Sequence, residues 1–528
     1  MRQEITLVIE YSVEGEKRCV SVDAAGDARP ADAARELGLV TRRAGECWRV
    51  EVTPAVAVTV ERMRARLSCD MVHAKAIYLN GYQSWTDSWE RRIWSAMPGL
   101  TRVPRFLVRN YGIDWNGDYR FTREDPRPGH QHGFGYAYVR YEDHVLLAGS
   151  LDESNGFTTI RQHAVKNLLR FDKEPPARTI GAGEKYELMG LYVGEGELGD
   201  QLDAWLAAAH VKALPARKLI GYTSWYRHYA DIDEAGLAHD LVGLSKVAGE
   251  VPHEDADVLF QVDDGYAKVG DWTTPDDERF PEGMAPLAAR AHTKGVLAGI
   301  WQAPFICERR SRVAAEHPDW VLRLPGAEGA NFNWSGALIL DTLNPEVREH
   351  VAKSLRTATE DWGYDLLKLD FLFAACMCPH GGMNRGQLMA DAIELIRSSI
   401  APGTRLLLCG VPLMSAFGTC EYCRVGCDVG LDWDDKPQMR LLHRERISTK
   451  RSLADARGRA HLDGRAFGCD PDVFFLRDDV KLTGLQRAEM IGTAAKSGSV
   501  MLTSDDMGAW DARRLAQYRS MVEEFLRS

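Results

Sequence analysis

Strand-like apolar runs alternate with helix-length stretches from Pro215 to the end of this chain of 528 residues. The stretches between the runs, such as Pro286–Thr293, Pro345–Asp361 and Gln387–Ile400, carry helical periodicity. This alternation predicts a (β/α)8 TIM barrel over residues 216–528. The strand candidates, of which the seventh has the weakest pattern, are Leu219–Trp225, Val258–Asp263, Val296–Trp301, Leu366–Asp370, Leu406–Gly410, Tyr422–Asp428, Ala466–Phe474 and Val500–Asp505.

The first part of the chain has a different pattern. Short β-type runs recur there between Gly, Asp and Pro clusters, namely Ile5–Tyr11, Cys47–Val52, Val56–Val60, His144–Ala148 and Lys185–Tyr192. This spacing predicts an N-terminal β-sandwich domain over residues 1–210. Leu198–Val211 is expected to be a connecting helix, and Pro215 marks the domain boundary.

Polar and aromatic residues gather at the predicted ends of the barrel strands, where such barrels carry their active sites. Lys368 and Asp370 are two positions apart, so they lie on the same face of a strand. Burying such a pair costs desolvation energy that a purely structural strand does not require. The other strand ends are Ser224-Trp225-Tyr226, Asp263-Asp264, Trp301, Cys409-Gly410, Arg424 with Asp428, and Ser504-Asp505-Asp506. Two carboxylates on separate strand ends, here Asp370 and Asp428, are the arrangement that retaining glycosidases use.

Charge and composition exclude several classes of partner. The formal net charge of −11 argues against nucleic acid or an anionic membrane as the main partner. No apolar run reaches the roughly 18 residues that span a bilayer, and the first ten residues lack the core of a secretory signal. With an odd number of cysteines, 11, we predict free thiols in a cytoplasmic protein. A homo-oligomer is possible, since no motif reports the oligomeric state.

Six groups of motifs follow one another in a fixed order along the chain. They are Gly81-Tyr82-Gln83-Ser84-Trp85; Gly221-Tyr222-Thr223-Ser224-Trp225-Tyr226; Phe260–Tyr266 with Gly270-Asp271-Trp272; Gly299-Ile300-Trp301; Leu367-Lys368-Leu369-Asp370; and Cys423–Asp428. In this order they resemble glycoside hydrolase family 36, in its shorter prokaryotic type. The best-known members of that family are α-galactosidases. The family commonly adds a small C-terminal β domain, which we expect to be absent because the chain ends shortly after Asp506.

The resemblance implies a retaining, exo-acting α-galactosidase that needs neither a metal nor an organic cofactor. Asp370 would be the nucleophile and Asp428 the general acid/base. Placement about 5 Å from a charged Asp370 would raise the pKa of Asp428, whereas neighbouring cations would lower the pKa of Asp370. The residues expected to bind the sugar are Asp263, Asp264, Lys368, Arg424, Trp301, Trp85, Tyr226 and Cys409.

The resemblance also implies individual contacts for most of these residues. Asp263 and Asp264 would bind the 4- and 6-hydroxyls of a galactose-like ring, and Lys368 the 3- and 4-hydroxyls. Arg424 would lie near the 2-hydroxyl. Trp301 would pack on the apolar face of the sugar, and Trp85 would close the pocket from the N-terminal domain. The expected substrates are α-galactoside oligosaccharides or glycoconjugates.

Structural interpretations compete with each functional one. Lys368–Asp370 could be a strut, Arg424–Asp428 a simple ion pair, and Asp263-Asp264 a metal site. The rival acids to Asp428 are Asp432, Asp434 and Asp435. Cys420-x2-Cys423-x3-Cys427 resembles a cluster-binding run, but small apolar filler is the favoured interpretation. His130-Gln131-His132 is expected to be a surface loop.

Other functions stay open on the same residues. The substrate could be an α-N-acetylgalactosaminide, or an acceptor sugar could replace water in a transglycosylation. From other classes, the chain could be a sugar-binding protein without activity, or a cysteine-ligated redox enzyme. The presence of both Asp370 and Asp428 disfavours a binding protein, since binding alone needs neither.

Overall fold

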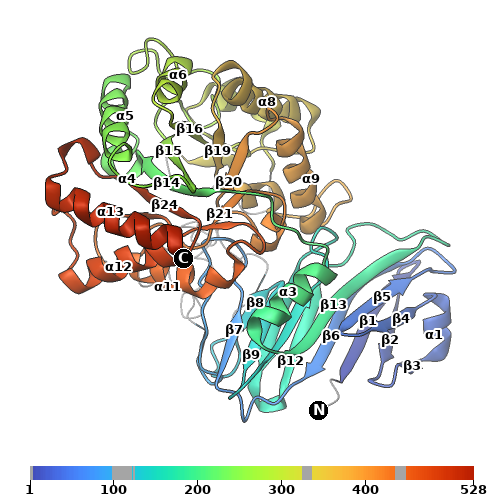
Figure 1. Ribbon diagram of the computed structural model, residues 1–528. Helices are drawn as coiled ribbons and strands as arrows, with labels where there is room; N and C mark the ends of the chain where they lie inside the picture. The colour runs from blue at the N-terminus through green and yellow to red at the C-terminus, as the bar shows by residue number, and fades with distance from the viewer. Residues whose placement is uncertain (1–3, 98–121, 123–124, 324–335, 435–446) are drawn as a thin grey trace.

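The computed structural model describes residues 4–97, 122, 125–323, 336–434 and 447–528. Two antiparallel sheets occupy the N-terminal part and one parallel sheet the rest, as Figure 1 shows. The predicted domain boundary, between residues 210 and 216, lies after the last strand of the two antiparallel sheets and the helix that follows it, and before the first parallel strand. The boundary stays a proposal. Among the described residues, no helix is both long and apolar enough to cross a lipid bilayer.

The antiparallel sheets enclose a shared apolar core. The first has the order β3-β2-β1-β6-β12-β11-β8 and the second β4-β5-β13-β10-β9-β7. Alternating burial along the strands places Ile9 of the first sheet and Val50 and Leu191 of the second in one hydrophobic cluster. These strands are β1 Ile5–Val13, β2 Glu16–Val22, β3 Ala28–Arg29, β4 Val40–Ala44, β5 Cys47–Val52, β6 Thr59–Ser68, β7 Ala76–Leu79, β8 His132–Phe134, β9 Tyr136–Arg140, β10 Val145–Ser150, β11 Thr158–His163, β12 Leu168–Lys173 and β13 Tyr186–Gly196. Two packed antiparallel sheets are consistent with the predicted sandwich.

The parallel sheet has the order β22-β21-β20-β19-β16-β15-β14-β24-β23. Its two end strands are only two residues apart in the chain, so the order is consistent with a TIM-like barrel. The strands are β14 Lys218–Thr223, β15 Ala256–Val262, β16 Leu297–Gln302, β19 Leu366–Leu369, β20 Arg405–Leu408, β21 Tyr422–Arg424, β22 Gly468–Asp470, β23 Val473–Phe474 and β24 Val500–Thr503. A small hairpin, β17 Ile306–Glu308 with β18 Ala337–Ile339, lies outside this sheet.

Helices surround the parallel sheet in Figure 1. Capping boxes start two of them, since Asn384 pairs with Gln387 in α9 and Thr483 with Gln486 in α12. The helices that follow β14 are α4 Trp225–His228, α5 Glu234–Ala248, α6 Ala285–Thr293, α7 Arg312–Glu316, α8 Pro345–Arg356, α9 Arg385–Ser398, α11 Thr449–Arg459, α12 Gly484–Lys496 and α13 Ala512–Arg527. Two others, α1 Ala31–Glu36 and α3 Leu198–Ala208, contact strands of the antiparallel sheets.

The structure corrects three predicted elements. The run Tyr422–Asp428 is not one strand, because β21 ends at Arg424 and Asp428 lies in the loop that follows. The seventh run is split into β22 and β23 around Pro471 and Asp472. The predicted surface loop at His130–His132 is wrong, because Gln131 and His132 are buried and β8 begins at His132.

Candidate active site

The carboxyl ends of the parallel strands bring most of the predicted site residues to one edge of the sheet. Trp301 lies within β16 and Lys368 within β19. The remaining residues follow a strand directly or end one, namely Asp263 and Asp264 after β15, Asp370 after β19, Cys409 after β20 and Arg424 at the end of β21. This is the edge at which parallel barrels place their chemistry.

Both carboxylate oxygens of Asp370 accept hydrogen bonds. Nε1 of Trp301 donates to Oδ2 at 3.2 Å, and the backbone N–H of Phe371 donates to Oδ1 at 2.7 Å. Phe371 has a left-handed backbone with φ 54°, which is rare for a bulky residue and recurs at functional sites. Burial raises the pKa of Asp370, although Lys368, the two donors and Arg424 act in the opposite direction. The neighbouring cations thus lower the pKa of Asp370 as expected, but desolvation outweighs them.

Lys368 forms its ion pair with Asp263, not with Asp370. Its Nζ lies 2.7 Å from Oδ2 of Asp263, and Nε2 of Gln261 donates to the same oxygen at 2.7 Å. The backbone N–H of Asp264 donates to the other oxygen of Asp263 at 3.0 Å. Burial alone would lower the pKa of Lys368, but Asp263 and Asp370 hold it above its usual value. The ion pair of Lys368 is therefore with Asp263, and Asp370 forms no ion pair with a cation among the described residues.

Arg424 holds three carboxylates at once. Nη1 lies 3.0 Å from Oδ1 of Asp428, Nε 3.0 Å from Oδ2 of Asp470, and Nη2 3.0 Å from Oδ1 of Asp472. The side chain of Asp428 is 38% exposed, whereas those of Arg424, Asp470 and Asp472 are 4%, 3% and 1% exposed. Asp428 is therefore the carboxylate of this group that solvent or a ligand can reach, and the simple two-residue ion pair considered above is an incomplete description.

The environment of Asp428 favours its protonated form. Burial among protein atoms raises its pKa, Arg424 and Lys368 oppose that effect, and the charges of Asp370 and Asp263 add to it. Of the rival acids, Asp434 accepts a hydrogen bond from Oγ of Ser448 at 3.1 Å. The backbone of Asp432 forms an isolated β-bridge with that of Lys481, and Asp435 lies outside the described residues.

Asp472 links this cluster to two further groups through hydrogen bonds. Its Oδ2 accepts hydrogen bonds from the hydroxyl of Tyr226 at 2.6 Å and from the backbone N–H of Val429 at 2.9 Å. Asp472 has a left-handed backbone with φ 74°. Burial raises its pKa to about 6, with Arg424 opposing and Asp428 and Asp470 adding to the shift. Tyr226, predicted to bind substrate, thus directs its hydroxyl at Asp472.

Sequence reasoning missed Asp470 and Asp472. They lie at the end of the seventh strand-like run, in Cys469-Asp470-Pro471-Asp472, which was the weakest of the eight patterns. The signal was available, since two aspartates at a barrel strand end fit the same rule that identified Asp263 and Asp370.

A segment of the N-terminal part completes the site. Nε1 of Trp85 donates to Sγ of Cys409 at 3.0 Å, and its ring packs edge-on against Phe371 at 5.2 Å between centroids. Oγ of Ser84 accepts from the N–H of Gly410 at 2.9 Å. Gly410 has φ 57°, and a Cβ there would lie 3.1 Å from the indole of Trp85. The structure therefore brings Trp85, Cys409 and the residue after Asp370 together.

The thiols of Cys420 and Cys423 interact with each other, but the cysteine run forms no group with metal-ligand spacing among the described residues. The thiols of Cys420, Cys423 and Cys427 contact different backbone carbonyls, those of Ala416, Arg424 and Ser448. In the described part of the chain, the only group with metal-ligand spacing is His239, Asp240 and Asp506. Arg227 already lies 3.0 Å from Asp240 and 2.9 Å from Asp506, so a cation fits poorly there.

Comparisons with known proteins match this chain to α-galactosidases. The family model described as Melibiase matches residues 219–378. An α-galactosidase 2 of Pediococcus pentosaceus is 30% identical over 120 residues, which are 21% of this chain and 16% of that protein. The chain therefore aligns with well under a fifth of the length of that curated relative.

Solved structures of two proteins, TtGalA and AgaA, align over most of the chain. The α-galactosidase TtGalA of Thermus thermophilus, solved with p-nitrophenyl α-D-galactopyranoside, is 27% identical with a TM-score of 0.71, covering 93% of this chain and 94% of its own. A second structure of TtGalA holds stachyose. The family 36 α-galactosidase AgaA of Geobacillus stearothermophilus is 13% identical with a TM-score of 0.58, covers 96% of this chain and 69% of its own, and supports the fold alone.

Proposed function

We propose that this chain, whose resemblance to glycoside hydrolase family 36 is borne out by these matches, is a retaining, exo-acting α-galactosidase. The observation that carries the proposal is the pair of carboxylates Asp370, directly after β19, and Asp428, in the loop after β21. Burial raises the pKa of Asp428, the cations Arg424 and Lys368 oppose this shift, and the charge of Asp370 adds to it. A raised pKa suits the general acid/base of a retaining pair.

In the first step, Asp370 attacks the anomeric carbon while the glycosidic C–O bond breaks and Asp428 gives its proton to the leaving oxygen. In the second step, Asp428 takes a proton from water as the water oxygen bonds to the anomeric carbon and Asp370 departs. The N–H groups of Phe371 and Trp301 hold Asp370 in place. Its charge stabilises the oxocarbenium-like transition state, and neither step requires a metal or organic cofactor.

Terminal α-galactosides of oligosaccharides or glycoconjugates are the proposed substrates. Asp263 and Lys368 offer a charged acceptor and a charged donor to ring hydroxyls, and such hydrogen bonds are the strong ones. Support comes from TtGalA, which was solved with stachyose and with an aryl α-galactoside. Trp301 and Trp85 would border the sugar, and Asp264, Arg424 and Cys409 lie at the same edge. We propose that the enzyme works in the cytoplasm, which its eleven unpaired cysteines favour.

The test is hydrolysis of an aryl α-galactoside by wild type, Asp370→Ala and Asp428→Ala, with azide rescue in each variant. The proposal expects the β-galactosyl azide from Asp370→Ala and the α-galactosyl azide from Asp428→Ala. Asp434→Ala is the matched control and should keep wild-type turnover. Turnover of an α-N-acetylgalactosaminide instead would replace the substrate, and galactose binding without any turnover would replace the enzyme by a binding protein.

A further inference from the structure

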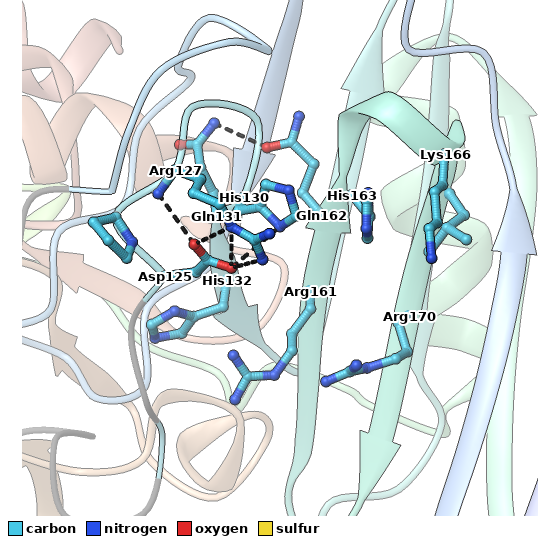
Figure 2. Close-up of a pocket in the computed structure, with 12 residues that line it drawn as sticks. Asp125, Arg127, His130, Gln131, His132, Arg161, Gln162, His163, Lys166 and Arg170 are labelled. Carbon is cyan, nitrogen blue, oxygen red and sulfur yellow. Dashed lines mark hydrogen bonds and ion pairs between the residues drawn. The ribbon is translucent and has the colours of Figure 1, made fainter.

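A cavity of about 590 Å³ opens on the N-terminal part, away from the strand ends that carry Asp370. It lies between the turn around Asp125 and the hairpin formed by β11, a short 3-10 turn Ala164–Lys166 and β12, as Figure 2 shows. The residues that line it are Asp125, Pro126, Arg127, His130, Gln131, His132, Arg161, Gln162, His163, Lys166, Leu168 and Arg170.

Positive charge dominates this lining. Four of these residues carry a permanent positive charge, and Asp125 is the single carboxylate among them. Asp125 is already engaged, because Arg127 donates to both of its oxygens and holds its pKa at about 2. Such a concentration of cations stands out in a chain whose net charge is −11.

The strand register stacks these cations on one face of the sheet. His132 lies opposite Arg161, and Arg161 lies opposite Arg170 on the next strand. Like charges in directly opposed positions destabilise a sheet. One carboxylate, Asp172, serves three guanidinium groups, those of Arg64 at 3.0 Å, Arg161 at 3.6 Å and Arg170 at 2.8 Å. An anion in the cavity would offset this repulsion.

The positive charges of this lining also affect a neighbouring histidine. The rings of His130 and His163 lie 4.4 Å apart. Burial lowers the pKa of His163 first, and the charges of His130, Lys166 and Arg127 lower it further. In Figure 2 the side chains of Arg161 and Arg170 extend to the same side of their two strands. Guanidinium groups match the geometry of phosphate oxygens.

The size of the cavity indicates which kind of molecule would carry the anionic group. Ligand cavities of roughly 300–1,000 Å³ enclose small organic molecules, and a lone phosphate would leave most of this one unfilled. Pro126 and Leu168 add apolar surface on which the C–H face of a sugar ring can pack. We propose that this cavity is a second ligand site, which binds the phosphate group of a phosphorylated sugar.

The site does not depend on the proposed hydrolase activity. Free phosphate shares the chemistry that the cations recognise, so the two sources have to be separated by experiment. Isothermal titration calorimetry at constant ionic strength would use glucose 6-phosphate, inorganic phosphate and galactose as probes. We expect saturable binding of glucose 6-phosphate, weaker binding of inorganic phosphate and none of galactose in this cavity.

Two variants test the residues. Lys166→Gln and Arg170→Gln should each weaken glucose 6-phosphate binding at least about tenfold, since each removes a charged hydrogen-bond donor. Asp172 would keep Arg64 and Arg161 as partners in Arg170→Gln. Arg62→Gln, an exposed arginine on β6 paired with Glu10, is the matched control and should bind as wild type.

Equal affinity for both phosphates would retain the phosphate site and assign free phosphate as its ligand. The proposal is overturned if neither phosphate gives a saturable signal. Wild-type affinity in both Lys166→Gln and Arg170→Gln would overturn it as well, and so would galactose binding that both substitutions abolish.

Discussion

The indole Nε1 of Trp85 donates a hydrogen bond to the thiol sulfur of Cys409 at 3.0 Å, joining residues 324 positions apart. Cys409 follows β20, next to the strand that ends in Asp370. The same indole packs edge-on against Phe371 and Phe373, at 5.2 and 5.9 Å between ring centroids. One aromatic side chain of the N-terminal part thereby borders the catalytic edge of the parallel sheet.

Replacing this tryptophan should weaken substrate binding more than it slows chemistry. We expect Trp85→Ala to raise KM roughly 2- to 13-fold, because the lost aromatic contact is worth ~0.5–1.5 kcal/mol, while kcat changes little. Trp85→Phe keeps the ring but loses the N–H donor, so its effect should be smaller. Steady-state kinetics on an aryl α-galactoside measures both, with the exposed Trp94→Phe as control. A fall in kcat with KM unchanged would place Trp85 in the chemistry instead.

The two carboxylates should give a bell-shaped dependence of kcat/KM on pH. In the proposed mechanism Asp370 acts ionised, so activity would be lost as pH falls through its pKa. Asp428 acts protonated in that mechanism, so activity would be lost as pH rises through its pKa. Burial raises both pKa values, so both limbs should lie at higher pH than unperturbed carboxyl groups would place them. In Asp428→Asn we expect kcat to fall roughly 10²–10⁴-fold and the alkaline limb to disappear. An alkaline limb that persists would assign the proton to another group.

Asp472 should set the position of that alkaline limb. In Asp472→Asn, Arg424 has one carboxylate fewer to share and pairs more closely with Asp428. A negative charge near Asp428 is also removed. Both changes lower the pKa of Asp428, so the alkaline limb should move to lower pH while the acid limb stays in place. A pH profile of kcat/KM tests this; equal displacement of both limbs would indicate a general structural effect.

Arg459 should be among the costliest residues to replace. It is fully buried in α11, and its guanidinium donates to the carbonyls of Gln83, Ser84 and Val425. Arg459→Met would leave these acceptors buried without their donor and should lower the free energy of unfolding by ~3–5 kcal/mol.

The matched control for this substitution lies two positions away. Arg457 is on the same helix, half exposed, and pairs with Glu489 at 2.9 Å. Arg457→Met should cost less than ~1 kcal/mol, as surface ion pairs generally do. Urea unfolding followed by tryptophan fluorescence compares the two variants. Equal losses would show that the contacts of Arg459 with residues 83 and 84 add little to stability.

The strands were predictable because most of them carry a short apolar run, as Leu406–Leu408 does in β20. Their ends were predictable too, which located Asp263, Lys368 and Asp370. Asp472 was not predicted as a site residue because Pro471 interrupts the strand-like run that contains it. No sequence pattern indicates that Asp472 takes a left-handed backbone, which depends on the contacts around it.

Contacts between distant segments account for the other omissions. Arg459 lies in a helix with a polar sequence, where arginine is normally solvated, and only the docked segment 80–88 makes it a buried donor. The raised pKa of Asp370 likewise depends on how completely the surrounding protein excludes water, which strand periodicity does not report.

The bond from Trp85 to Cys409 also bears on how the chain matures. At 5–20 residues per second, the ribosome needs ~16–65 s to make the 324 residues that separate the two partners. Throughout that interval Trp85, Ser84 and the carbonyls of Gln83 and Ser84 have been synthesised before their partners Cys409, Gly410 and Arg459. Until those partners are made, the polar groups of residues 80–88 bond to water or to the N-terminal part, so this segment can dock against the parallel sheet only late in synthesis.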